Sequence, residues 1–220
     1  MSGQGRRSER DVRRRSLGQN FLADRSLISR FVAGLDLVPG DLVVDAGAGA
    51  GALTVPLAMA GVEVWAVERD DLWVDRLRSA IDRAGVVDSV RVIRGDLRTV
   101  RLPRSPYRVV ANPPFGLTTA LLERLLDDPD RGPERVDVVL QREVARKHAA
   151  DVPRSLRAAA WAPWWSFSLG MDIDRRAFRP VPSVDASVLR IDRRNPPILP
   201  TGLAPGFVEV LRPLWGGGAN

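Results

Sequence analysis

Short apolar segments alternate with amphipathic ones through most of the chain, and this alternation restricts the possible fold more than any other feature. Residues 42–47 (LVVDAG), 62–70 (VEVWAVERD), 90–96 (VRVIRGD) and 107–115 (YRVVANPPF) are typical of buried parallel strands. Residues 51–62, 72–85 and 117–128 have helical periodicity, and Gly85 is expected to close the second of these helices. Strands that alternate with helices predict a doubly wound α/β sheet.

The segments on either side extend this pattern. Asp24 stands at the N-cap of a predicted helix whose apolar residues recur at helical spacing, and residues 135–149 predict a strand that passes into a helix. Residues 164–173 and 183–191 predict a closing antiparallel pair. Beyond Asp192 the chain is rich in proline and glycine, with one short helix expected over 205–215 that docks Phe207, Leu211 and Trp215. We therefore expect one main domain over 16–192 and a Pro/Gly-rich segment over 193–220.

Composition excludes several classes of protein. The chain has 220 residues, 45% of them hydrophobic, which suits one domain of generous size. It has no cysteine and one histidine, His148, which excludes disulfides and argues against a metal site or a Ser/His/Asp triad. We see no apolar run near 18 residues and no secretory leader, so we expect a cytoplasmic protein.

Positive charge gathers at the N-terminus. The net charge is +6, and RRSERDVRRRS carries six arginines against two acids with no apolar periodicity. The preference for arginine over lysine has an alternative cause in a GC-rich genome, but that does not explain the location. Residues 1–15 are predicted to form a flexible basic arm, with Arg13, Arg14 and Arg15 meeting RNA phosphates. A merely solvated tail is the alternative.

Polar or glycine residues follow the predicted strands. They are Asp45, Gly47, Glu68, Asp96 and Asn112. Because ligands of α/β sheets bind beyond the carboxyl ends of the strands, these positions predict one site. The glycines of GAGAGA and the acid at Glu68, which could accept both ribose hydroxyls, suit nicotinamide dinucleotides as well as S-adenosylmethionine. Asp96 either accepts from an adenine amino group or caps a turn.

The stretch Asn112-Pro-Pro-Phe115 favours one chemistry over the other. Methyl transfer to an aromatic amine demands placement, because the nitrogen lone pair is delocalised into the ring. The Asn112 oxygen and a backbone carbonyl of Pro-Pro could accept from the two N–H groups, and Phe115 could stack on a base that has left its helix. Such stacking is worth ~1–3 kcal/mol, comparable with the few kcal/mol that base extraction costs. An inert turn is the alternative.

These motifs resemble the rRNA adenine N6-methyltransferase family, which includes the erythromycin-resistance (Erm) enzymes and the small-subunit dimethyladenosine transferases. The matching segments are LGQNFLADRSLI, VVDAGAGAGALT, VWAVERD, IRGDL, VVANPPFGLTTALL, VVLQREVARK and FRPVPSVDASVLRI, over about residues 13–192. The resemblance implies a Rossmann-like, S-adenosylmethionine-dependent catalytic domain over 16–192, followed by a short remnant of the usual helical C-terminal domain.

By that resemblance Asn20 and Leu22 contact the methionine part of the cofactor, and Phe115 stacks on the target adenine. Phe178 is either a second aromatic wall or a core residue. The catalytic assignment covers Asn112, Pro113 and Phe115. The cofactor site is assigned to Gln19, Asn20, Leu22, Gly47, Glu68, Asp96 and Asn112, with Gly49 and Leu97 beside them.

The arginine-rich leader and the VVANPPFG context favour the Erm branch. The implied substrate is one adenine of 23S rRNA, modified before ribosome assembly is complete by a monomer without an obligate protein partner. The implied phenotype is resistance to macrolides, with lincosamides and streptogramin B also open. The alternatives are a 16S rRNA dimethylase, a DNA adenine methylase, an RNA-binding assembly factor without turnover and a nicotinamide oxidoreductase. Pro113 and Ala186 depart from the isoleucine and serine usual in the family.

Overall fold

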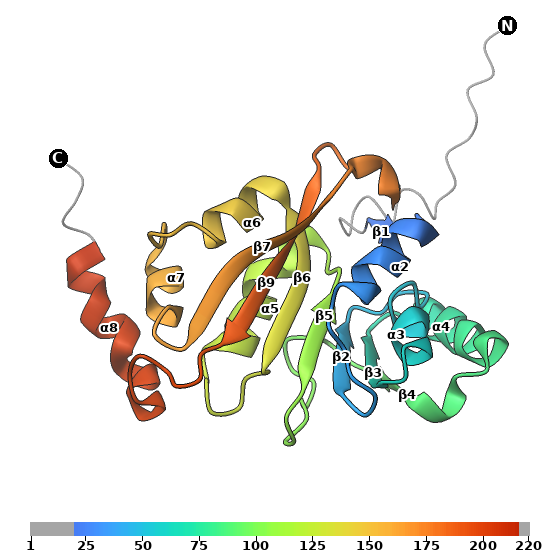
Figure 1. The fold of residues 1–220 in the computed structure, drawn as a ribbon, viewed down its shortest axis with the longest axis horizontal. Helices are drawn as coiled ribbons and strands as arrows, with labels where there is room; N and C mark the ends of the chain where they lie inside the picture. The colour runs from blue at the N-terminus through green and yellow to red at the C-terminus, as the bar shows by residue number, and fades with distance from the viewer. Residues whose placement is uncertain (1–19, 216–220) are drawn as a thin grey trace, which may run out of the picture.

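A seven-stranded sheet forms the centre of the molecule in this computed structural model, which describes residues 20–215 (Figure 1). The strand order is β4-β3-β2-β5-β6-β9-β7. The strands are β2 (Leu42–Ala46), β3 (Glu63–Glu68), β4 (Val90–Arg94), β5 (Arg108–Ala111), β6 (Arg135–Gln141), β7 (Trp165–Ile173) and β9 (Ala186–Arg193). Strands β2 to β6 pair in parallel, and β9 is antiparallel to both β6 and β7. The predicted α/β sheet with a closing antiparallel pair is confirmed.

Helices cover both faces of this sheet because side chains alternate along each strand. Val43 packs into one core cluster with α2 (Arg25–Ala33), α3 (Thr54–Met59) and α4 (Asp71–Ala84). Its neighbour Val44 packs into the other with α5 (Thr118–Leu126), α6 (Arg142–His148) and α7 (Leu156–Trp161). The predicted caps are confirmed: Asp24 accepts from the Leu27 N–H at 3.0 Å, and Gly85 ends α4 with a φ of 67°.

Three features differ from the expected elements. Helix α3 is shorter than 51–62 because residues 51–53 form the turn that leaves the glycine loop. Helix α7 was not predicted. A second, two-stranded sheet joins β1 (Phe21–Leu22) to β8 (Phe178–Arg179), which are far apart in the sequence. Short pairings of this kind leave no periodic pattern for a sequence reading to detect.

The C-terminal helix α8 (Ala204–Trp215) lies beside α7 at the edge of the molecule opposite β4 (Figure 1). Phe207 docks as expected: its ring meets that of Trp164 edge-on, with the two ring centroids 5.4 Å apart. Leu211 is half-buried, whereas Trp215 is 42% exposed and its expected docking is wrong. None of the helices in the described part of the chain is long and apolar enough to cross a membrane.

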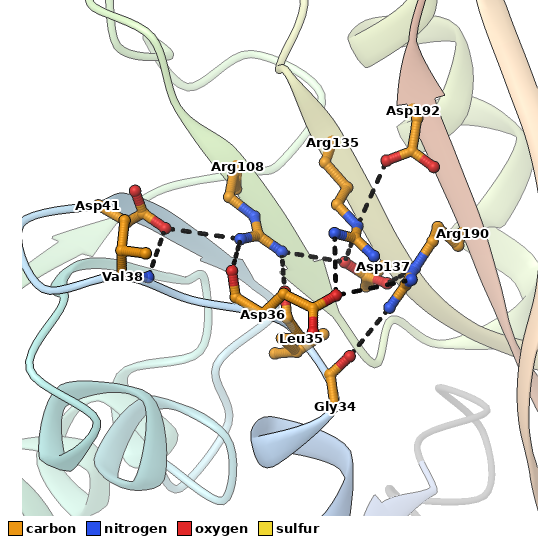
Figure 2. A network of polar contacts seen from close by, with 10 residues as sticks. All are labelled: Gly34, Leu35, Asp36, Val38, Asp41, Arg108, Arg135, Asp137, Arg190 and Asp192. Carbon is orange, nitrogen blue, oxygen red and sulfur yellow. Dashed lines mark hydrogen bonds and ion pairs between the residues drawn. The ribbon is translucent and has the colours of Figure 1, made fainter.

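A buried ionic network fastens α2 to the amino ends of the central strands (Figure 2). Arg108 of β5 donates to the carbonyl of Asp36 at 3.0 Å and to that of Leu35. Arg190 of β9 donates to the Gly34 carbonyl at 2.9 Å. Gly34 is the C-cap of α2, and its carbonyl is one that a helix end leaves without a partner. Leu35 and Asp36 follow in the turn that leaves the helix, so the arginines bind both the end of α2 and this turn.

One carboxylate lies at the centre of this network. Asp137 on β6 is 1% exposed and lies 3.3 Å from Arg135, 3.2 Å from Arg190 and 3.8 Å from Arg108. Burial raises the pKa of Asp137 to about 6, and Arg135 and Arg108 oppose that rise. The network therefore balances a buried negative charge with three cations while anchoring α2 to the sheet.

We expect Arg108→Met to destabilise the fold by about 1–3 kcal/mol, because the Leu35 and Asp36 carbonyls lose their arginine donor. The buried Asp137 carboxylate keeps Arg135 and Arg190 as its cations. Urea unfolding measures this loss. The matched control is Arg78→Met, which removes an exposed arginine from α4. A loss below about 1 kcal/mol, the size expected for a surface ion pair, would contradict the role of the network.

Candidate functional site

A cavity of about 320 Å³ opens at the carboxyl edge of the sheet. The glycine loop after β2, Glu68 at the end of β3, Asp96 after β4 and Asn112 after β5 all reach it, because parallel register brings these strand ends level. The cavity is lined by Asn20, Phe21, Gly47, Val67, Glu68, Arg69, Gly95, Asp96, Leu97, Arg98, Asn112, Pro114, Gly116 and Leu117.

The glycine loop approaches the cavity with its backbone. Gly47, Gly49 and Gly51 have φ of 89°, 54° and 88°, a region that side chains disfavour. A Cβ at Gly47 would stand 3.8 Å from a Leu97 methyl group and 4.0 Å from the Pro113 Cα. A ligand can therefore rest directly on the backbone at Gly47, as expected for a nucleoside cofactor.

Glu68 joins β3 to the glycine loop. Its carboxylate accepts from the N–H groups of Gly49 at 2.9 Å, Arg69 at 2.8 Å and Asp70 at 2.9 Å. A carboxylate offers about four acceptor sites, so about one remains for a ligand hydroxyl. The sequence predicts that Glu68 accepts from both ribose hydroxyls. Two hydroxyls would have to share its Oε2 atom or displace one of the backbone N–H donors.

Asp96 has the turn-cap role of the alternative prediction, and its contact with an adenine amino group stays a prediction. Asp96 accepts from the Arg98 N–H at 2.9 Å, as a turn cap does, and it also faces the cavity. The Arg98 side chain adds hydrogen bonds of 2.9 and 2.6 Å, and Arg69 lies 3.5 Å away. These bonds, led by Arg98, hold the pKa of Asp96 well below its usual range. The group is therefore an ionised acceptor at neutral pH.

Among the described residues, one backbone group orients the Asn112 amide. Its Nδ2 donates to the Asn20 carbonyl at 2.9 Å. A carbonyl only accepts, so the Asn112 amide must present its nitrogen there and direct its oxygen elsewhere. The Pro114 carbonyl accepts from the Leu117 N–H at 2.8 Å. The buried Pro113 carbonyl accepts no hydrogen bond from residues 20–215.

Several predicted residues stand apart from the cavity wall. The Leu22 side chain is 4% exposed and packs in the core, and Phe115 is half-buried beside the cavity at the start of a short 3₁₀ turn. Phe178 is 0% exposed, so it is the core residue of the alternative prediction and offers no surface to a base. Gln19, Arg13, Arg14 and Arg15 lie outside the described residues, and their roles stay predictions.

Eight residues of the cavity wall are not among the predicted site residues: Phe21, Val67, Arg69, Gly95, Arg98, Pro114, Gly116 and Leu117. Phe21 lies within the QNFL motif, next to a predicted contact. Arg69 and Arg98 lie one and two residues from the predicted acids, but an exposed arginine gives no sequence signal of its own. No group of side chains suited to a metal ion occurs within residues 20–215.

Asp45, also predicted for this edge, supports the site from beneath. It is 1% exposed and accepts a 2.6 Å hydrogen bond from the Thr54 hydroxyl of α3. It does not line the cavity. Burial raises the pKa of Asp45 to about 7, partly opposed by Thr54. This residue therefore joins β2 to α3 rather than binding a ligand.

Comparisons with known proteins agree with this geometry. Residues 10–214 match the ribosomal RNA adenine dimethylase family. An rRNA methyltransferase of Streptomyces thermotolerans is 41% identical over 93% of this chain and 67% of its own length. The mycinamicin-resistance protein MyrB of Micromonospora griseorubida is 35% identical over 93% of this chain and 63% of its own.

The solved structure of the 23S rRNA methyltransferase ErmE superposes with a TM-score of 0.77 at 32% identity. This match covers 90% of this chain and 81% of that one. Across the curated relatives compared, the chain spans between 50% and 70% of their lengths.

We expect Asp45→Asn to flatten the pH dependence of stability. With a pKa of 3.8 before folding and about 7 after it, the folded protein keeps a proton that the unfolded chain releases. The stabilisation that Asp45 contributes to the folded state is therefore full below pH about 4 and is lost as the pH rises through about 7. Urea unfolding at pH about 5 and about 8 measures the change.

The raised pKa of Asp137 also makes the free energy of unfolding fall as the pH rises, in the parent and in Asp45→Asn alike. The dependence of stability on pH is therefore reduced in Asp45→Asn rather than abolished. Asp88→Asn, at an exposed carboxylate, is the control and should leave the slope unchanged. Equal slopes in the parent and Asp45→Asn would contradict the assignment.

Proposed function

The chain belongs to the ribosomal RNA adenine dimethylase family, and from that membership we propose that it methylates the N6 amino group of one adenine in 23S rRNA. S-adenosylmethionine is the cofactor, and it supplies a methyl group activated on a sulfonium. Gly47 offers the bare backbone, Glu68 an acceptor for a ribose hydroxyl and Asp96 an ionised acceptor for an adenine amino group. The residues present therefore fit this cofactor.

The orientation of Asn112 carries the proposal. Because the Asn20 carbonyl holds the amide nitrogen, the Asn112 oxygen is free to accept from the amino group of a target base. The Pro113 carbonyl offers a second acceptor from the same loop. Phe115, which begins the 3₁₀ turn after this loop, is proposed to stack on the base. Two fixed acceptors align the nitrogen for an in-line displacement.

No general base is needed at the moment of transfer, because the N6 lone pair would form the new bond to carbon as the sulfur–carbon bond breaks, and the extra proton would leave the nitrogen for solvent afterwards. The single histidine, His148, lies at the end of α6 beside the rings of Trp161 and Phe167. Burial lowers the pKa of His148. Catalysis in this proposal depends on placement and on hydrogen-bond acceptors.

The choice of 23S rRNA and of resistance rests on similarity. MyrB is named for mycinamicin resistance and ErmE for 23S rRNA, and both exceed 30% identity to this chain. We therefore propose that a monomer of this protein modifies 23S rRNA before the large subunit is assembled, and that the modification confers macrolide resistance.

The test is transfer of labelled methyl groups from S-adenosylmethionine to protein-free 23S rRNA, to assembled large subunits, to 16S rRNA and to DNA. We expect label in protein-free 23S rRNA, on one adenine mapped by primer extension, and little in the other three. Label confined to 16S rRNA or to DNA would overturn the proposed substrate.

We predict that Asn112→Ala abolishes methyl transfer, with a fall in kcat of at least about 100-fold. The loss of one hydrogen-bonding group that stabilises the transition state lowers kcat by ~10²–10³ in other enzymes. Binding of S-adenosylhomocysteine, measured by calorimetry, should survive because Gly47, Glu68 and Asp96 remain. The matched control is Asn195→Ala, which removes an amide far along the chain beyond β9. Full activity of Asn112→Ala would sink the mechanism.

A further inference from the structure

The Phe21 ring lies against the glycine loop. A Cβ built on Gly49 would come within 2.9 Å of the Phe21 Cε1 atom and 3.2 Å of Cδ1. The ring therefore occupies the space that a side chain at position 49 would need. This contact explains why the middle glycine of the loop has no room for a larger residue, in addition to its φ of 54°.

Trp73 of α4 holds the Phe21 ring in that place. The two ring centroids are 4.5 Å apart with planes tilted by 40°, within the range of favourable aromatic pairs. Trp73 is only 7% exposed, and the Arg76 guanidinium lies 4.7 Å from its ring centroid. Helix α4 begins directly after Glu68, whose carboxylate accepts from the N–H of the N-cap residue Asp70. Trp73 therefore stands on a rigid support next to the site.

The position of Phe21 bears directly on Asn112. The carbonyl that binds the Asn112 amide belongs to Asn20, and its carbon is bonded to the Phe21 nitrogen. Because this peptide unit is planar, a shift of the Phe21 backbone moves the Asn20 oxygen with it. The antiparallel pairing of Phe21 with Arg179 fixes the strand, and the ring contacts fix its side chain.

We propose that Trp73 is a positioning residue for methyl transfer. It packs Phe21 against the glycine loop and thereby holds the Asn20 carbonyl that orients the Asn112 amide. This inference rests on the proposed function, in which Asn112 accepts from the target amino group. Trp73 does not line the cavity. In this proposal it nevertheless controls the geometry of the reaction, through Phe21 and Asn20.

Trp73→Leu keeps an apolar side chain but removes the aromatic face. We expect kcat on protein-free 23S rRNA to fall at least about 10-fold, the order that a small misplacement of reacting groups costs. The KM for RNA and the Kd for S-adenosylhomocysteine should change less than about 3-fold. Trp73→Phe should restore most of kcat, since it returns an aromatic partner to Phe21.

The matched control is Trp65→Leu. Trp65 lies on β3, is half-buried and also has an arginine, Arg91, over its ring at 4.8 Å. The same change there should leave kcat unchanged at temperatures where both variants are folded. An equal fall in kcat in both variants, or no fall in Trp73→Leu, would overturn the proposal.

A second measurement does not depend on activity. The side-chain amide resonances of Asn112, identified by their loss in Asn112→Ala, should shift and exchange faster with solvent in Trp73→Leu but not in Trp65→Leu. Unchanged resonances in Trp73→Leu would overturn the link from Trp73 to Asn112. Full activity of Asn112→Ala would instead overturn the proposed function, so the two failures are distinguishable.

Discussion

The parallel register of β2, β3 and β5 is the constraint on which the site depends. Ala46 pairs with Val67 on one side and with Ala111 on the other, so the residues that follow each strand emerge at the same level. The glycine loop, Glu68 and Asn112 meet there although the chain separates them by tens of residues. Backbone hydrogen bonds between the parallel strands set this spacing.

The segment that carries Asn20 lies outside this sheet and has to be held against it. At one end, Phe21 and Leu22 pair with β8, and Trp73 packs on the Phe21 ring. At the other end, the arginine network around Asp137 fastens the carbonyls that follow α2 (Figure 2). Helix α2 is therefore anchored on both sides. Burying the charges of Asp137 and Arg108 is costly, and the network they form fixes the position of a helix that the site requires.

Features that depend on neighbouring residues in the sequence were predicted correctly, whereas contacts between distant segments were not predicted. The burial alternation and the caps at Asp24 and Gly85 follow from short-range rules, so the strands and most helices agree with the structure. The division of the chain at residue 192 stays a prediction, although Leu199 and Phe207 beyond it pack on the main core. Phe178 could not be assigned from sequence, because an aromatic residue at a strand start suits a core and a base-stacking wall equally well.

The sequence by itself determined the fold class, the edge of the sheet where the cavity lies and the types of group at that edge, because the periodic pattern shows where each strand ends. Only the tertiary structure decided how those groups are used. It showed that Glu68 is largely occupied by backbone N–H groups and that Asp45 supports α3. It also placed the Asn112 nitrogen on Asn20, 92 residues away in the chain. Such contacts depend on how separate elements pack, and no local pattern encodes them.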